Sequence, residues 1–347
     1  MGRYNMPPFN PLISLLCRPQ RVSELADAQW NDVIEQGRKT QLLGQLAAQL
    51  RQAGVFEQVL PAVSRHLMLD ELTAGRRSEA ALWELRGIRR AIDPSIPIVA
   101  LKGCAYAVAK DANASGRLFS DVDVMVRRHD LPAVESALFG VGWKPSRVNA
   151  YDSAYYRDWM HEVPPMEHVR RHTVVDLHHA INPPVSRYYI DPEQLFACLV
   201  EVMPGIFVLS VQDRIIHCAL HLLQEGETKK LIRELYDLHL LLNQHCDSSE
   251  RIQQLEDRAD VLKVGGLLRT AVGAAQTLFS ENHWHHQTGW LQGCVERVAH
   301  MDSKNTLLGE LSALAILAHS HWMKMPMRLL VPHLARKTWL KWFPEKD

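Results

Sequence analysis

A seven-residue stretch in the first half of the chain combines a strand pattern with two acidic residues. Residues 120–126 read Ser-Asp-Val-Asp-Val-Met-Val, and this strict alternation predicts a β-strand. Successive side chains of a strand point to opposite faces, so Asp121 and Asp123 share one face while the valines share the other. Two adjacent carboxylates repel each other and are costly to bury without a cationic partner. The stretch therefore predicts a strand that presents two carboxylates to a cation.

Two further runs predict strands near this pair. Residues 96–103 (IPIVALKG) are apolar and β-branched and end at a glycine, as expected of a strand that enters a turn. In residues 170–181 (RRHTVVDLHHAI), Asp176 and His178 alternate with apolar residues, so they share one face of a predicted strand. If the two aspartate-bearing strands are neighbours, their three carboxylates converge on one spot.

Helices are predicted on both sides of these strands. Residues 23–40, with Ser23 as the expected N-cap, and a long run that ends near residue 93 both show helical spacing of apolar residues. From about residue 191 the chain again reads as helical. The predicted fold class is α+β, with a small mixed-sheet core flanked by helical regions. The predicted domains are an N-terminal helical region (1–94), an α/β core (95–190) and a C-terminal helical region (191–347).

Charge and cysteine content narrow the functional classes. Lysine plus arginine equals aspartate plus glutamate, at 39 each, so no net charge draws the chain to nucleic acid. The six cysteines form no CxxC pair, which is typical of reduced thiols in a cytoplasmic protein. No stretch approaches the roughly 18 uninterrupted apolar residues that span a bilayer. We therefore expect a cytoplasmic protein.

The C-terminal stretch from His321 to Phe343 is basic and aromatic. Its composition is typical of a helix that lies on a membrane surface, so peripheral membrane contact is one interpretation. Pro326 and Pro332 interrupt the helical period, and a helix docked on the protein itself is the other interpretation.

The expected carboxylate cluster suits a hard divalent cation. Mg²⁺, and alternatively Mn²⁺, prefers carboxylates, water and phosphate oxygens as ligands. Two such ions bridged by Asp121 and Asp123 would stabilise the attacking and leaving oxygens of a phosphoryl displacement. The turn at Gly103 is expected to expose backbone N–H groups beside a helix start, where phosphates bind. Lys102 and Arg117 are candidates to neutralise a triphosphate.

These motifs together resemble the nucleotidyltransferase superfamily with the polymerase-β-like fold, and most closely a bacterial branch described as uncharacterised nucleotidyltransferases. That superfamily places Gly-Gly or Gly-Ser after its first strand, then an Asp-apolar-Asp strand, then a third aspartate on a later strand. Gly103 matches the first glycine, Asp121 and Asp123 match the pair, and Asp176 matches the third aspartate. Cys104 departs from the pattern because it stands where the second glycine or serine is expected.

The resemblance implies roles for particular residues. The carboxylates of Asp121, Asp123 and Asp176 would be catalytic and bind the metal. Lys102, Gly103 and Arg117 would lie near the nucleotide. Ser120, His161 and His178 are candidates to contact the substrate or to support the metal ligands.

The expected activity is Mg-dependent transfer of a nucleoside monophosphate from a nucleoside triphosphate to an unidentified acceptor, with release of pyrophosphate. A small molecule, or a peptide or polysaccharide precursor, is favoured over nucleic acid as the acceptor. An alternative is a catalytically silent nucleotide-binding or scaffold protein of the same fold. A second alternative is a zinc hydrolase, because residues 161–179 contain five histidines, although their spacing is not H-E-x-x-H.

Simpler interpretations remain for several of these residues. The aspartate pair could be neutralised by Arg127 and Arg128 on a solvent-facing strand. Asp176 could pair with Arg170 or Arg171. In the predicted helix at residues 229–245, Arg233, Tyr236 and Asp237 are typical of a helix–helix salt bridge with a buried tyrosine, and a wall of the acceptor pocket is the alternative.

Overall fold

A single mixed sheet forms the centre of the sheet-bearing half of the molecule. The computed structural model describes residues 10–146, 159–226, 228–279, 289–299 and 307–332. Its seven strands run in the order β3-β4-β5-β2-β1-β7-β6. Their bounds are β1 Ile98–Ala100, β2 Asp121–Met125, β3 Trp143–Pro145, β4 Met166–His168, β5 Val174–His178, β6 Val200–Met203 and β7 Ile206–Val208. The α+β class with a mixed sheet is confirmed.

The pairing of β2 with β5 brings the predicted acidic residues together. The two strands are parallel and adjacent, and Asp123 pairs directly with Asp176. Residues in register on neighbouring strands point to the same face of a sheet. Asp121 lies two residues before Asp123 on that face, so the register places all three carboxylates close together on one face of the strand pair.

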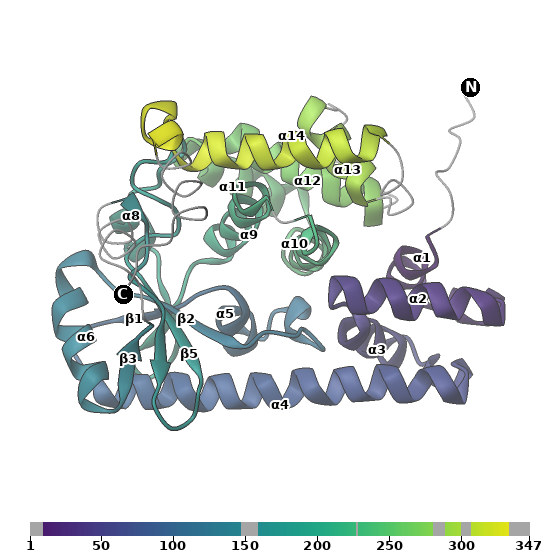
Figure 1. The fold of residues 1–347 in the computed structure, drawn as a ribbon, viewed down its shortest axis with the longest axis horizontal. Coiled ribbons are helices and arrows are strands. Elements are labelled where there is room, and N and C mark those ends of the chain that lie inside the picture. The colour runs from purple at the N-terminus through teal and green to yellow at the C-terminus, as the bar shows by residue number, and fades with distance from the viewer. Residues whose placement is uncertain (1–9, 147–158, 227, 280–288, 300–306, 333–347) are drawn as a thin grey trace, which may run out of the picture.

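The N-terminal helices lie beside the sheet and beneath it. They are α1 Pro11–Cys17, α2 Asp27–Thr40, α3 Leu43–Gln52 and α4 Pro61–Ala91, followed in the core by α5 Lys102–Ala109 and α6 Leu131–Gly140. The long helix α4 runs under both α3 and the sheet (Figure 1) and contacts α3, α5, α6 and β2. It therefore joins the N-terminal helices to the core.

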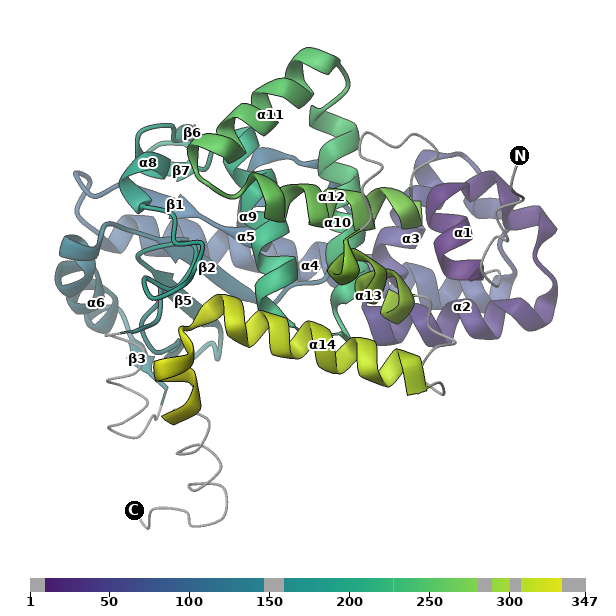
Figure 2. The same ribbon diagram turned by 90° about the horizontal axis from the view of Figure 1, so that it is seen from above.

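The C-terminal helices cover the opposite side. They are α8 Pro192–Phe196, α9 Val211–Glu225, α10 Leu231–His245, α11 Ser249–Val261, α12 Gly265–Phe279, α13 Trp290–Ala299 and α14 Leu307–Lys324. Helix α9 contacts α10, α11, α12 and α14, and α14 extends across the molecule past α13 (Figure 2). One large apolar cluster runs through these helices and α1–α3, and a second lies between the sheet and α4–α6. The space between the two layers is where the site described below lies.

Two sequence expectations about the elements are wrong. The hairpin of β6 and β7 lies in the segment expected to be helical from residue 191, because its short alternating runs flank a Pro204-Gly205 turn. Ser23 is not the N-cap of a helix: it lies in a 3₁₀ helix (Pro19–Glu24) that proline opens, and α2 starts later, after Ala26. The Gln29 side chain then accepts a hydrogen bond from the backbone N–H of Ala26.

No helix among the described residues is both long and apolar enough to cross a membrane. Of the C-terminal basic-aromatic stretch, Trp322 lies on α14, where its ring is 4.1 Å from the guanidinium of Arg187. The later aromatic residues, Trp339, Trp342 and Phe343, lie outside the described residues, so membrane contact remains a prediction.

Candidate functional site

A cleft of about 490 Å³ lies between the aspartate-bearing strands and the helices. Most of the residues that the sequence predicted for the site line it: Lys102, Gly103, Arg117, Ser120, Asp121, Asp123, His161 and Asp176. His178 lies behind this lining and reaches Asp123. The opposite wall comes from α4, α9, α10 and α14. The structure thus gathers residues from distant parts of the sequence around one cavity.

The three aspartates converge as their register requires. Asp121, Asp123 and Asp176 each contribute a carboxylate oxygen, and these atoms lie within 4.8 Å of one another. Asp123 is buried, whereas the other two are partly exposed to the cleft. The Oδ1 atom of Asp176 is buried and accepts no hydrogen bond within the described part of the chain. Buried carboxylate oxygens are normally satisfied, so this atom is available for a ligand.

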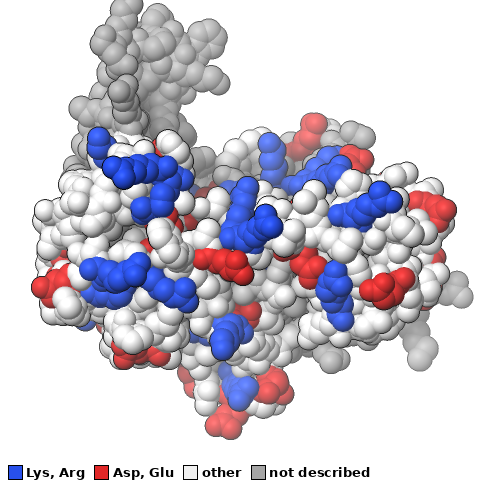
Figure 3. Space-filling model, turned by 90° about the horizontal axis from the view of Figure 1, so that it is seen from below, with Lys and Arg blue, Asp and Glu red and all other residues white. Residues whose placement is uncertain are grey.

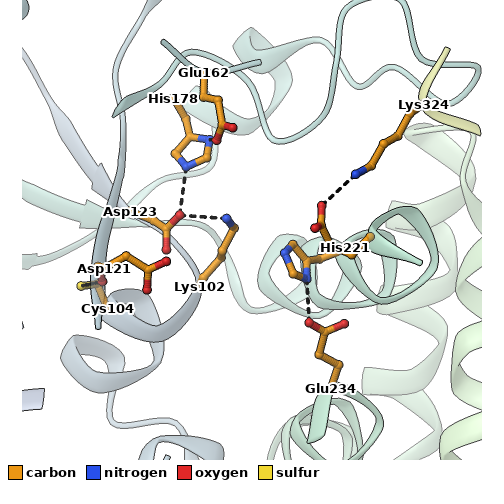
Figure 4. Close-up of polar contacts among 10 residues, drawn as sticks. Lys102, Cys104, Asp121, Asp123, Glu162, His178, His221, Glu234 and Lys324 are labelled. Carbon is orange, nitrogen blue, oxygen red and sulfur yellow. Dashed lines mark hydrogen bonds and ion pairs between the residues drawn. The ribbon is translucent and has the colours of Figure 1, made fainter. Parts of the chain in front are cut away.

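Asp123 accepts hydrogen bonds from two sides (Figure 4). Its Oδ1 accepts one from Lys102 Nζ at 2.8 Å and one from His178 Nε2 at 3.0 Å. Burial alone would raise the pKa of Asp123, but Lys102 and His178 outweigh it and hold that pKa well below its usual range. Asp123 in turn raises the pKa of Lys102 against the opposing effect of burial. Asp123 is therefore ionised and Lys102 charged at neutral pH.

Asp176 has the opposite electrostatic environment. Burial, together with the nearby charge of Asp123, raises the pKa of Asp176 to about 7. The cluster therefore carries more negative charge than its single lysine neutralises. An additional cation would relieve both the repulsion and the unsatisfied Asp176 oxygen. Three converging carboxylates fit Mg²⁺ or Mn²⁺, which take oxygen ligands.

A second group of donors lies beside the first. One donor atom from each of His161, Glu162 and His178 lies within 4.8 Å of the others. His178 Nδ1 is 3.4 Å from a carboxylate oxygen of Glu162, so one imidazole stands between the carboxylates of Asp123 and Glu162. The His161 ring lies 5.3 Å from the His178 ring, and burial holds the pKa of His161 well below its usual range. The hydrogen bond from His178 orients Asp123. The imidazole nitrogens of His161 and His178, together with Glu162, are also a set of ligands that zinc accepts.

Gly103 and Cys104 lie in the first turn of α5, which begins directly after β1. A Cβ atom on Gly103 would come within 2.7 Å of the Phe119 ring, so a side chain there would displace that ring. The Cys104 thiol is buried and donates to the carbonyl oxygen of Asp121 at 3.9 Å. Burial raises the pKa of Cys104, so it is a neutral thiol that packs against β2. Ser120 is exposed at the rim of the cleft.

Arg117 has a carboxylate partner inside the protein. It lines the cleft but is buried, and its Nε donates to Asp237 of α10 at 2.8 Å. Asp237 therefore forms a salt bridge to the segment before β2 rather than the helix–helix salt bridge expected from the sequence, whereas Tyr236 is buried as expected. A place for Arg117 near the nucleotide stays a prediction.

Two of the arginines that offered simpler pairings for the aspartates pair with other carboxylates. Arg127 pairs with Glu193 at 3.2 Å, and Arg171 pairs with Glu84 at 2.6 Å. Arg171 is thus directed towards α4 rather than towards Asp176. These contacts leave the acidic cluster facing the cleft.

Several residues of the cleft were not identified from the sequence. Gln41 and Arg77 reach it from the N-terminal helices, and Glu225, Lys230 and Lys324 reach it from the C-terminal ones. Their spacing along the chain carries no signal, because the packing of helices far apart in sequence brings them together. For Arg233 the sequence predicted either a helix–helix salt bridge or a place in the pocket wall, and the residue does line the cleft.

Comparison with known proteins identifies the family. The model of the uncharacterised nucleotidyltransferase family matches residues 26–280, most of the chain, including all three aspartates and the helices α9 and α10. Searches of curated proteins and of solved structures found no match. The matched region contains the sheet and both walls of the cleft apart from Lys324. The chain belongs to the uncharacterised nucleotidyltransferase family, and its enzyme class is that of the transferases of phosphorus-containing groups.

Proposed function

We propose that the protein is a divalent-metal-dependent nucleotidyltransferase that moves a nucleoside monophosphate group from a nucleoside triphosphate to an acceptor and releases pyrophosphate. The observation that carries this proposal is the convergence of Asp121, Asp123 and Asp176 in a cleft of about 490 Å³. Family membership supports the reaction class. The set of oxygen donors supports Mg²⁺, or Mn²⁺, as the cofactor.

Each aspartate has a role in this reaction. Asp121, Asp123 and Asp176 would hold the cation, which supplies positive charge to the phosphoryl group during transfer. Asp123 is oriented by His178 and Lys102, so its carboxylate is held in place before substrate binds. Asp176 lines the cleft, and its Oδ1 has no hydrogen-bond donor among the described residues, so its carboxylate would also accept the proton of the acceptor hydroxyl.

The chemical step is an in-line displacement. The acceptor oxygen forms a bond to the α-phosphorus, and the bond from that phosphorus to the oxygen bridging to the β-phosphorus breaks. The electron pair leaves with pyrophosphate. Lys102 lies close enough to the aspartates to share its charge with a phosphate. The backbone N–H groups of Gly103 and Cys104, in the first turn of α5, are suited to a phosphate oxygen.

The acceptor is proposed to be a small molecule, or a peptide or polysaccharide precursor. On the face covered by α4, basic and acidic side chains are interspersed (Figure 3), and the chain has no net charge. A nucleic acid acceptor would favour a continuous basic track. Mixed charge therefore supports a smaller acceptor, bound between the strands and the helical wall.

The test is calorimetric binding of ATP in the presence of Mg²⁺. Wild-type protein is expected to bind ATP only with the metal, and Asp123→Ala is expected to lose this binding. The matched control is Asp32→Ala on the exposed side of α2, which is expected to behave as wild type.

The comparison of wild type with Asp123→Ala also distinguishes an active enzyme from a catalytically silent nucleotide-binding protein. Metal-independent ATP binding that Asp123→Ala does not change would contradict the proposed function. Incubation of wild-type protein with α-labelled ATP and pooled metabolites is expected to transfer label to an acceptor, and Asp123→Ala is expected to abolish that transfer.

A further inference from the structure

The helical wall of the cleft carries charged and polar side chains, and several of them contact one another. Lys324 of α14 pairs with Glu225 of α9 at 3.0 Å, and His221 pairs with Glu234 at 3.2 Å (Figure 4). These contacts account for both glutamates of this wall. Arg233 of α10, one residue before Glu234, takes part in neither contact.

Arg233 is a buried cation with an unsatisfied donor. Its side chain lines the cleft, although the residue is only 8% exposed. One terminal nitrogen donates to the side-chain oxygen of Gln41, but the buried Nε has no hydrogen-bond partner among the described residues. A guanidinium stays charged in proteins and presents five donors, so an open N–H in a buried position is costly.

The surroundings of Arg233 favour an anion. Burial and the positive charge of Arg117 both lower the pKa of Arg233, because nearby carboxylates only partly offset them. Arg117 itself is neutralised by Asp237 at 2.8 Å. Asp237, Glu234 and Asp121 offset part of this effect, but no carboxylate forms an ion pair with Arg233 among the described residues. With its Nε unsatisfied as well, a bound anion would stabilise Arg233.

A second guanidinium reaches the same cleft from another helix. Arg77 lies on α4, is exposed, and lines the cavity together with Gln41 and Arg233. Arginine forks match the geometry of phosphate oxygens and bind them in a bidentate manner. Two arginines on separate helices thus face the wall that carries the three aspartates.

We propose that Arg233, together with Arg77 and Gln41, forms an anion subsite that binds a phosphate group of the substrate on the helical wall of the cleft. The inference rests on the proposed function for the identity of that substrate. The phosphate belongs either to the triphosphate of the nucleotide or to a phosphorylated acceptor, and the two sources bind through the same chemistry.

The test compares wild type with Arg233→Gln in calorimetric titrations with ATP, AMP and inorganic triphosphate in the presence of Mg²⁺. If the triphosphate occupies the subsite, Arg233→Gln weakens ATP and inorganic triphosphate about tenfold or more and leaves AMP unchanged. Arg233→Lys retains the charge without the fork and is expected to be intermediate. The control is Arg251→Gln on α11, which removes a guanidinium that is 54% exposed and outside the cleft lining, and it is expected to bind as wild type.

If a phosphorylated acceptor occupies the subsite instead, Arg233→Gln leaves ATP unchanged but abolishes binding of inorganic phosphate to the ATP-saturated protein. Unchanged binding of every one of these ligands overturns the inference. Failure of wild type to bind ATP contradicts the proposed function alone, because binding of inorganic triphosphate still reports on Arg233. Should Arg233→Gln not fold, as judged by thermal unfolding, the exposed Arg77→Gln decides: it is expected to weaken the same ligands about threefold, and no weakening overturns the inference.

Discussion

Two ion pairs of equal length border the cleft: one lies within its strand-bearing side, and the other joins that side to α10. Lys102 and Asp123 are joined at 2.8 Å, and so are Arg117 and Asp237. The Lys102 side chain is 25% exposed, whereas that of Arg117 is 10% exposed. Asp237 also accepts a hydrogen bond from Gln45 of α3 at 3.0 Å, so three parts of the fold meet at its carboxylate.

This difference indicates different roles. The Lys102 ammonium is a point charge on a flexible stem, and a cation or a phosphate in the cleft can replace its contact with Asp123. The guanidinium of Arg117 is enclosed, and breaking a buried pair leaves a charge uncompensated. We therefore interpret the first pair as exchangeable and functional, and the second as the connection between α10 and the core.

The largest effect is expected from the buried pair. Asp237→Asn leaves Arg117 buried without its counter-charge, and we expect the free energy of unfolding to fall by roughly 3–4 kcal/mol. Urea denaturation followed by circular dichroism measures this loss. The control is Asp247→Asn, which breaks an exposed pair with Arg251 and should cost about 0.5 kcal/mol or less. A loss at Asp237 no larger than that of the control would contradict a structural role for the pair.

A smaller and metal-dependent effect is expected from the exchangeable pair. Lys102→Met leaves the three carboxylates without their resident cation, so we expect the metal-free protein to lose about 2 kcal/mol of stability. Saturating Mg²⁺ should remove most of this loss, because the added ion neutralises the same carboxylates. Urea denaturation in chelator and in Mg²⁺ measures both values. An equal loss under the two conditions would show that Lys102 is structural, like Arg117.

The part of the site on the strands could be predicted from the sequence. The alternation around Asp121 and Asp123 and around Asp176 fixes which side chains share a face, and only the adjacency of the two strands had to be assumed. The structure has that adjacency, with Asp123 beside Asp176. Local periodicity was sufficient because each carboxylate is placed by its own strand.

The helical wall could not be predicted in the same way. Arg117 and Asp237 are 120 positions apart, and Gln41 and Arg233 are 192 apart, so their contacts depend on how helices pack. The β6–β7 hairpin was missed for a different reason. Its strands have only four and three residues, too few for periodicity to exclude a helix, although Pro204-Gly205 is a turn signal.

The smallest expected effect concerns a neutral side chain on the helix that carries Asp237. His239 Nε2 accepts a hydrogen bond from Asn243 Nδ2 at 2.9 Å, and its ring lies near the rings of Tyr236 and Phe279. Burial lowers the pKa of His239 to about 4, from an ordinary value near 6.5. The unfolded chain therefore binds a proton below pH 6.5 that the folded protein does not, so stability is complete above that pH and falls as the pH drops towards 4.

We expect His239 to contribute about 1 kcal/mol to the loss of stability between pH 7 and about pH 5.5. His239→Gln should make this loss of unfolding free energy smaller by that amount. His129→Gln, at a side chain that is 75% exposed, is the control and should leave the loss unchanged. Other buried histidines also contribute to the pH dependence of stability. The relevant measurement is therefore the difference between the two variants in the loss of unfolding free energy. An unchanged pH dependence in His239→Gln would contradict the lowered pKa of His239, because a group with the same pKa in both states contributes none.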